Sequence, residues 1–302
     1  MGASAGAWAI LALRVLLVGV ERVLLRAFGA GRAPEEAAAA FFGVGALVLL
    51  PFAAPWTRGD WSLLRLAAPS GLIYAGAYWL YVSAFSRGEV SAVAPLGALS
   101  GVFVVWLASV FYDEPLSWPV LLGAGLISAS AIGLQPTGGS EQGAAGRPRR
   151  RWGTAEWQMT GYALLTALTR MLDRAAARGA PGSATLYAWA VFTIVALCQC
   201  ALLAARGRLR GLGELVAGRP WIALAAGTCN GGSFLLLVVA MASLPVSLAE
   251  PLTACSLLVS AAIAWLAFRE PVRARWLPTL GVIAGTWLLV VGGSPLPGSP
   301  QG

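Results

Sequence analysis

Long apolar runs without a charged side chain dominate the sequence, and short polar stretches separate them. A helix rises about 1.5 Å per residue, so about 20 apolar residues are enough to cross the hydrocarbon core of a bilayer. A run that is long enough for two spans, Pro220–Phe268, holds one acid, Glu250, and a turn at Ser243–Pro245 divides it. The other charge-free runs predict one membrane helix each, at Ala37–Thr57, Leu66–Ser86, Val90–Tyr112, Pro115–Ser140, Gly179–Ala205 and Trp276–Val291.

Two further segments have the length of a span but carry several charges. Ala5–Phe28 contains Arg14, Glu21, Arg22 and Arg26, and Trp157–Ala177 contains Arg170, Asp173 and Arg174. The first segment lacks a basic stretch ahead of its apolar run, and Arg14 interrupts that run, so we interpret it as a retained helix rather than a signal peptide.

An internal repeat supports both charged segments. When the sequence is shifted by 156 positions, residues 65–116 align with residues 221–272 without a gap, and 15 of the 52 pairs are identical. The charged segments align at a shift of 148, which places Arg22 on Arg170 and Arg26 on Arg174. A fixed period of this kind is the signature of a duplicated structural unit.

Each unit therefore holds five predicted helices. Because five is odd, the second unit enters the membrane from the opposite side, as in the inverted repeats of many transporters. We predict an all-α integral membrane protein of ten transmembrane helices, built as two inverted-topology five-helix repeats. The expected divisions are a first repeat over residues 1–134, a Gly- and Arg-rich linker over 135–156, a second repeat over 157–291 and a disordered tail over 292–302.

Composition agrees with a membrane protein and narrows the chemistry. The chain is 58% hydrophobic and 11% charged, whereas soluble domains carry about 25% charged residues. It has no histidine, and its four cysteines lie in apolar stretches, so we expect no metal site, no cofactor and no enzyme activity. The formal charge of +8 comes from arginines at segment ends, where membrane topology places them, and it does not predict nucleic-acid binding.

A duplicated motif resembles a known family. Val90-Ser-Ala-Val-Ala-Pro95-Leu is followed by an apolar helix and by Asp113-Glu114-Pro115, and Val246-Ser-Leu-Ala-Glu-Pro251-Leu leads in the same way to Arg269-Glu270-Pro271. This pattern resembles the EamA-type ten-helix branch of the drug/metabolite transporter superfamily. The resemblance implies a central cavity between the repeats and alternating access by rocking of helical units around it.

Several polar residues inside the predicted helices are candidates for that cavity. An intramembrane charge is costly unless it is paired or functional, and Tyr74, Tyr78 and Tyr81 recur along one helix face. Ordinary aromatic packing, arginines that extend to the interface and a structural ion-pair network, with Glu21 meeting Arg170, remain alternatives. The predicted cavity residues are Tyr74, Tyr78, Asn230, Glu21, Arg22, Arg170 and Asp173.

The acid Glu250 precedes Pro251 near the start of a helix and has no arginine close to it in sequence. We therefore predict it as a candidate proton carrier, with an acid at the helix N-terminus, facing the interface, as the alternative. The remaining motif residues are expected to form structural turns: Pro95, Glu114, Pro115, Pro251, Glu270 and Pro271.

These features predict a secondary transporter that moves a small metabolite or amphipathic compound. The alternatives are a lipid-linked flippase of the same fold and a transport-inactive membrane scaffold. No ATPase motif is present, so a gradient would supply the energy. The expected partners are the substrate, membrane lipids and a second copy of the chain, and the expected location is the bacterial inner membrane.

Two arguments about orientation disagree. With both termini in the cytoplasm, the inner loops would carry four arginines and the outer loops fourteen, among them Arg147–Arg151. Short cytoplasmic loops normally carry the excess of positive charge, which favours both termini outside. The family resemblance implies termini inside, and we follow the charges.

Overall fold

The computed structural model is helical throughout the part of the chain that it describes. The described residues are 5–29, 34–53, 61–87, 96–97, 99–114, 116–134, 153–179, 183–268 and 276–292. The first half contains α1 (Ala5–Gly29), α2 (Pro34–Ala53), the short 3₁₀ helix η2 (Trp61–Leu63), α3 (Leu64–Arg87), α5 (Leu99–Tyr112) and α6 (Trp118–Leu134). The second half contains α7 (Thr154–Gly179), α8 (Ala184–Ala205), α9 (Leu209–Gly218), α10 (Pro220–Met241), α11 (Val246–Thr253), α12 (Ser256–Phe268) and α13 (Trp276–Gly292).

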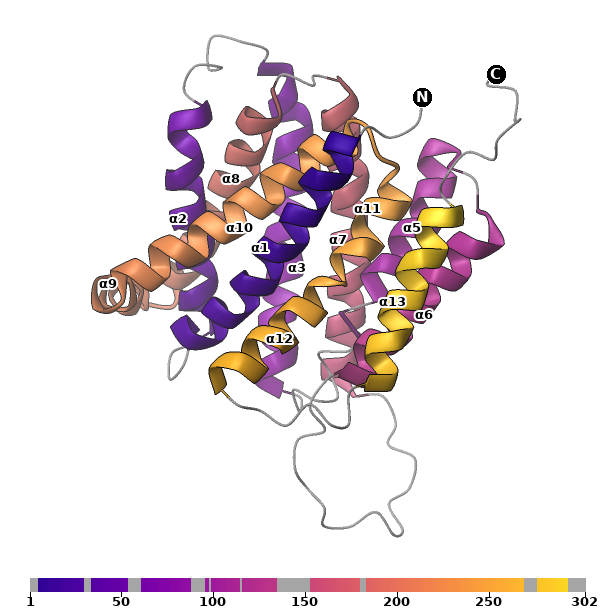
Figure 1. Cartoon of the computed structure of the whole chain (residues 1–302). Helices are drawn as coiled ribbons and strands as arrows, with labels where there is room; N and C mark the ends of the chain where they lie inside the picture. Colours follow the sequence, from indigo (N-terminus) through magenta and orange to yellow (C-terminus); the bar gives the residue numbers. More distant parts are fainter. Residues whose placement is uncertain are drawn as a thin grey trace.

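Both charged segments are long helices, as the repeat predicted. α1 spans 25 residues and α7 spans 26, although neither has an uninterrupted apolar run. The first turn of α1 and the last turn of α13 lie on the same side of the bundle, the upper side in Figure 1. Most of the predicted linker and tail lies outside the described residues.

Two features of the second half were not predicted. The ten-residue helix α9 is too short to span a bilayer. Its Leu215 packs with Phe28 and Phe41, while its Arg210 is exposed. The apolar stretch after Pro245 is two helices rather than one, because the chain makes a tight turn at Ala254 and Cys255 between α11 and α12.

The two halves interlock rather than stand side by side. The main packing partners join a helix of one half to a helix of the other, and this holds for α1 with α10, α3 with α7, α2 with α8, α5 with α11 and α6 with α13. In Figure 1, α1 crosses in front of α3 and runs beside α10, far away in the sequence. The core is therefore shared between the halves.

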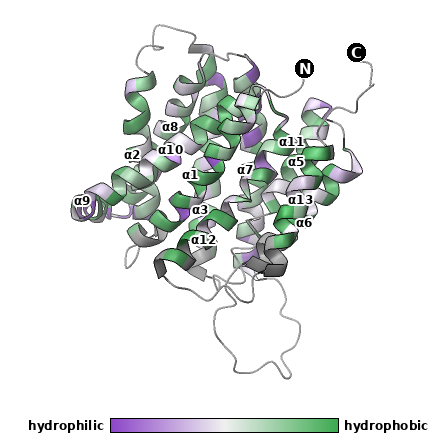
Figure 2. Cartoon of the chain, viewed as in Figure 1, coloured by the Kyte–Doolittle hydropathy of each residue, from purple (hydrophilic) through white to green (hydrophobic). Residues whose placement is uncertain are grey.

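The polarity of the bundle is inverted relative to a soluble protein. Leu13, Leu16 and Trp106 are about half exposed, while Arg14 and Arg170 are buried. Figure 2 shows that hydrophobic residues dominate the helices. In the described part, three helices are long and apolar enough to cross a membrane alone, at Glu35–Ala53, Ala184–Ala205 and Pro220–Met241, and shorter apolar helices accompany them. An apolar exterior around buried charge is what a bilayer requires, so the chain is an integral membrane protein.

Candidate functional site

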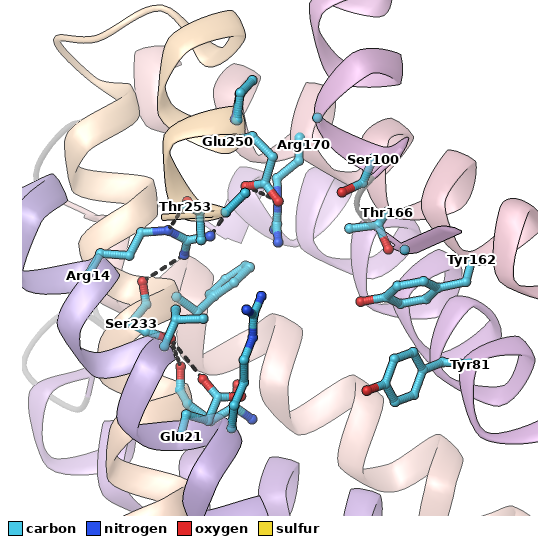
Figure 3. A pocket seen from close by; sticks show the side chains of 18 of the residues that line it. Arg14, Glu21, Tyr81, Ser100, Tyr162, Thr166, Arg170, Ser233, Glu250 and Thr253 are labelled. Carbon is cyan, nitrogen blue, oxygen red and sulfur yellow. Dashed lines mark hydrogen bonds and ion pairs between the residues drawn. The ribbon is translucent and has the colours of Figure 1, made fainter. Parts of the chain in front are cut away.

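A cavity of about 300 Å³ lies between helices of both halves. Figure 3 shows its two walls, one charged and one formed by hydroxyl-bearing side chains. Each of α1, α3, α7, α10 and α11 contributes polar residues to it. Those residues are Arg14, Glu21, Arg22, Tyr74, Tyr78, Tyr81, Tyr162, Thr166, Arg170, Asn230, Ser233, Glu250 and Thr253.

The charged wall is organised around Glu250. Its Oε2 lies 3.3 Å from Nη2 of Arg14 and 3.0 Å from Nε of Arg170, so one carboxylate bridges two guanidinium groups. Arg14 also donates to the hydroxyl of Thr253 at 2.9 Å and to the carbonyl of Ser233 at 3.0 Å. These bonds hold α1 against α10 and α11.

A second carboxylate supports Arg170 from behind. Nη1 of Arg170 lies 2.8 Å from Oδ2 of Asp173, one helical turn later in α7. The other oxygen of Asp173 accepts hydrogen bonds from Tyr187 at 2.7 Å and from Ser70 at 3.2 Å. Asp173 is fully buried and is not among the residues that line the cavity, so its prediction as a cavity residue is wrong. Its role is to hold Arg170 in place.

The four charges form one neutral chain from Arg14 through Glu250 and Arg170 to Asp173. Moving a single ion from water into an apolar interior costs roughly several kcal/mol. An oppositely charged partner offsets this cost only when the remaining polar atoms of both groups also form hydrogen bonds. Here each acid has at least two hydrogen-bond donors. Glu250 has no arginine close to it in sequence, but Arg14 and Arg170 reach it from distant helices, so its carboxylate is paired.

The other end of the charged wall holds Glu21 and Arg22 of α1. The carboxylate of Glu21 accepts a hydrogen bond from Ser233 at 3.4 Å. The alternative in which Glu21 meets Arg170 does not hold, since Arg170 bonds Glu250, Asp173 and the hydroxyl of Tyr74 instead. Glu21 and Arg22 thus line the cavity apart from the bonded chain of charges.

Tyrosines form the opposite wall. The rings of Tyr78 and Tyr81 lie 5.7 Å apart between centroids, and the ring of Tyr162 lies 4.9 Å from that of Tyr81. Figure 3 shows the hydroxyls of Tyr81 and Tyr162 directed into the cavity, next to Ser100 and Thr166. This wall offers aromatic faces and hydroxyls to a ligand at the same time.

Tyr74 links the two walls. Its hydroxyl accepts a hydrogen bond from Arg170 at 3.3 Å, and the guanidinium carbon of Arg170 lies 5.5 Å from the centre of the Tyr74 ring. Phe234 presents its ring to the same guanidinium at 5.8 Å. These contacts restrict the rotation of the Arg170 side chain.

Sequence reasoning missed several lining residues that a helical spacing indicates. Tyr162, Thr166 and Arg170 recur every four positions along α7, so they share a face. Arg14 and Arg22 are spaced by eight along α1 and share a face in the same way.

Of the predicted structural turns, Glu114 and Pro251 fall in the described part. Glu114 accepts hydrogen bonds from the backbone of Val246 and Ser247 at the start of α11, and Pro251 lies inside α11 and lines the cavity. The others, Pro95, Pro115, Glu270 and Pro271, lie outside the described residues.

Comparison with known proteins agrees with this architecture. A solved crystal structure superposes with a TM-score of 0.72 at 18% sequence identity, over 96% of this chain and 98% of its own, so it shares the fold. A search of the curated proteins finds no match. Residues 5–134 match the family model of the EamA-like transporter family. The predicted resemblance to the drug/metabolite transporter superfamily is therefore confirmed over these residues.

Proposed function

We propose that the protein is a secondary transporter that carries a small metabolite or amphipathic compound through the cavity by alternating access. The observation that supports this most is a polar cavity of about 300 Å³ inside an apolar bundle, with lining residues from both halves. A structural core in a membrane has no need of a cavity with both charged and aromatic walls, because buried charge is costly there.

We further propose that the two halves are inverted five-helix repeats that form this cavity as a pair. Under the shift of 148, the lining residues Arg14, Val18 and Arg22 of α1 align with the lining residues Tyr162, Thr166 and Arg170 of α7. Packing partners follow the same exchange, since α1 with α10 corresponds to α7 with α3. Equivalent positions of the two units thus face one cavity, as a pseudo-twofold axis through it requires.

Transport into proteoliposomes tests the proposal. The purified chain would be reconstituted and offered a panel of labelled metabolites, with and without a pH gradient. We expect uptake of at least one compound, a strong loss with Tyr78→Ala, and near-normal uptake with Trp79→Ala, since Trp79 is the next residue but is 39% exposed on the outside of the bundle.

The alternatives give different results in the same vesicles. Movement of a labelled lipid between leaflets, without metabolite uptake, would favour a flippase. Folded protein that moves neither class would favour a membrane scaffold. Equal losses with Tyr78→Ala and Trp79→Ala would count against the cavity as the transport route.

A further inference from the structure

Arg22 and Arg170 occupy equivalent positions of the two repeats, and both line the cavity. Arg170 has two carboxylate partners, Glu250 at 3.0 Å and Asp173 at 2.8 Å. The sequence has Ala94 and Leu25 at the positions that align with these two acids, and neither side chain can pair with a cation. The repeat thus duplicates the arginine without duplicating the two carboxylates that bond Arg170.

The surroundings of Arg22 differ accordingly. Its side chain is exposed toward the cavity, and within the part of the chain that the structure describes its guanidinium forms no hydrogen bond or ion pair. The neighbouring Glu21 lines the same cavity and interacts electrostatically with Arg22, but its carboxylate accepts its hydrogen bond from Ser233. Five N–H donors of one guanidinium therefore face the cavity without an acceptor from the described residues.

A second donor without a partner lies in the same cavity. The side-chain nitrogen of Asn230 is buried and has no hydrogen-bond partner among the described residues, and Asn230 is 7% exposed. Asn230 lies in α10. The hydroxyl of Ser233 donates a hydrogen bond to the backbone carbonyl of Asn230, which leaves the side-chain amide of Asn230 without this partner. A buried donor without an acceptor costs about 1–3 kcal/mol, and a ligand oxygen would remove that cost.

We propose that Arg22 and Asn230 bind the anionic group of the transported compound, a carboxylate or a phosphate. In this arrangement the ligand supplies to Arg22 the acceptor that Glu250 supplies to Arg170. A planar guanidinium matches either anion with two parallel hydrogen bonds, and the rest of the ligand packs against the rings of Tyr78, Tyr81 and Tyr162. That the bound compound is also transported rests on the proposed function, whereas the binding of the anion does not depend on transport.

Matched probes on one benzene frame separate the ligand classes. The purified full-length chain in detergent contains 13 tryptophans, so unfolding can be followed by intrinsic fluorescence. Benzoate, phenyl phosphate, benzylamine and benzyl alcohol would each be titrated, and the shift in Tm recorded. We expect one or both anions to raise Tm, with the stronger of the two identifying carboxylate or phosphate, and benzylamine and benzyl alcohol to have little effect.

Variants then assign the effect to the site. Arg22→Gln should weaken anion binding by about 10- to 100-fold, the range expected for loss of charged hydrogen bonds, and Arg22→Lys should retain part of it. Arg210→Gln makes the same change of net charge at a side chain that is 92% exposed, and it should bind as the wild type does. Asn230→Asp keeps the size of the side chain and should repel the anion, which provides a second test if Arg22→Gln does not fold.

Three results would overturn the proposal: stabilisation by benzylamine in place of the anions, no stabilisation of the wild type by either anion, or undiminished anion binding in Arg22→Gln and Asn230→Asp. Anion binding without any metabolite uptake in vesicles would support this site while contradicting transport. The two proposals can therefore fail separately.

Discussion

Glu114 and Ser247 lie 133 positions apart, yet the carboxylate of Glu114 accepts hydrogen bonds from both the amide and the hydroxyl of Ser247, at 3.1 Å and 2.5 Å. The amide of Val246 adds a third at 3.2 Å. The free N–H groups at the start of α11 are thus capped by an acid from the other half of the chain. An acid at a helix N-terminus also interacts favourably with the helix dipole.

Removal of this cap should destabilise the fold. We expect Glu114→Ala to lower the free energy of unfolding by about 1–2 kcal/mol, the usual range for loss of a capping side chain. Denaturant unfolding in detergent would measure it. The control is Glu214→Ala on α9, whose pair with Arg210 is largely exposed and should contribute less than about 1 kcal/mol. Equal effects of the two substitutions would contradict the capping role.

Glu250→Gln should act mainly on stability, because it leaves Arg14 and Arg170 without their shared counter-ion. Loss of one partner from a buried ion pair costs about 3–5 kcal/mol. A large drop in Tm of the purified protein is the expected result, and Glu35→Gln, whose partner Arg206 is 41% exposed, is the control. A Glu250→Gln protein with normal Tm that lost only its dependence on a pH gradient would instead favour a proton carrier.

Close packing of α2 and α10 makes Gly227 intolerant of a larger residue. A Cβ added there would lie 2.7 Å from Cβ of Val44 and 2.9 Å from the backbone nitrogen of Gly45. Gly227→Ala should therefore cost about 1–3 kcal/mol. Gly76→Ala is the matched change, because nothing lies within 4 Å of the added carbon, and alanine should stabilise that helix by about 0.5–1 kcal/mol. The free energy of unfolding, measured with denaturant in detergent, should therefore fall in Gly227→Ala and rise in Gly76→Ala.

Orientation can be decided by a reporter that is active only in the cytoplasm, fused after Gly302. The first turn of α1 and the last turn of α13 share one side of the bundle. With that side outside, the division into loops that the sequence predicts assigns fourteen arginines to the cytoplasmic side and four to the outer side. We therefore expect no signal from this fusion and a strong signal from a fusion within residues 147–151. The reverse pattern would show that the family expectation is correct.

The sequence predicted the structure best where the length of an apolar run or the spacing of residues along one helix determines it. Apolar run length predicted most of the helices, and the repeat predicted that α1 and α7 are helices despite their charges. The pair of Arg170 and Asp173 has a local origin of the same kind, since helix geometry brings side chains at i and i+3 together.

Contacts between distant segments could not be predicted in this way. Glu250 and Arg14 are 236 positions apart, and only the interlocked packing of the two halves brings them within 3.3 Å. Asp173 has the polarity of a cavity residue but lies behind Arg170, and no pattern in one sequence separates a residue that faces a cavity from one that supports it. The short helix α9 was missed because it is too short to produce a spanning signal.

The short helix α11 belongs to the second half by sequence, but the first half bonds both of its ends. Glu114 bonds its first turn, and Arg14 bonds Thr253 and Glu250 in its last two turns. A motion that separated the two halves as rigid blocks would have to break all of these bonds at once. The halves of the sequence are therefore different from the mechanical units of this molecule, because in this state α11 is bonded to α1 and to the segment that carries Glu114.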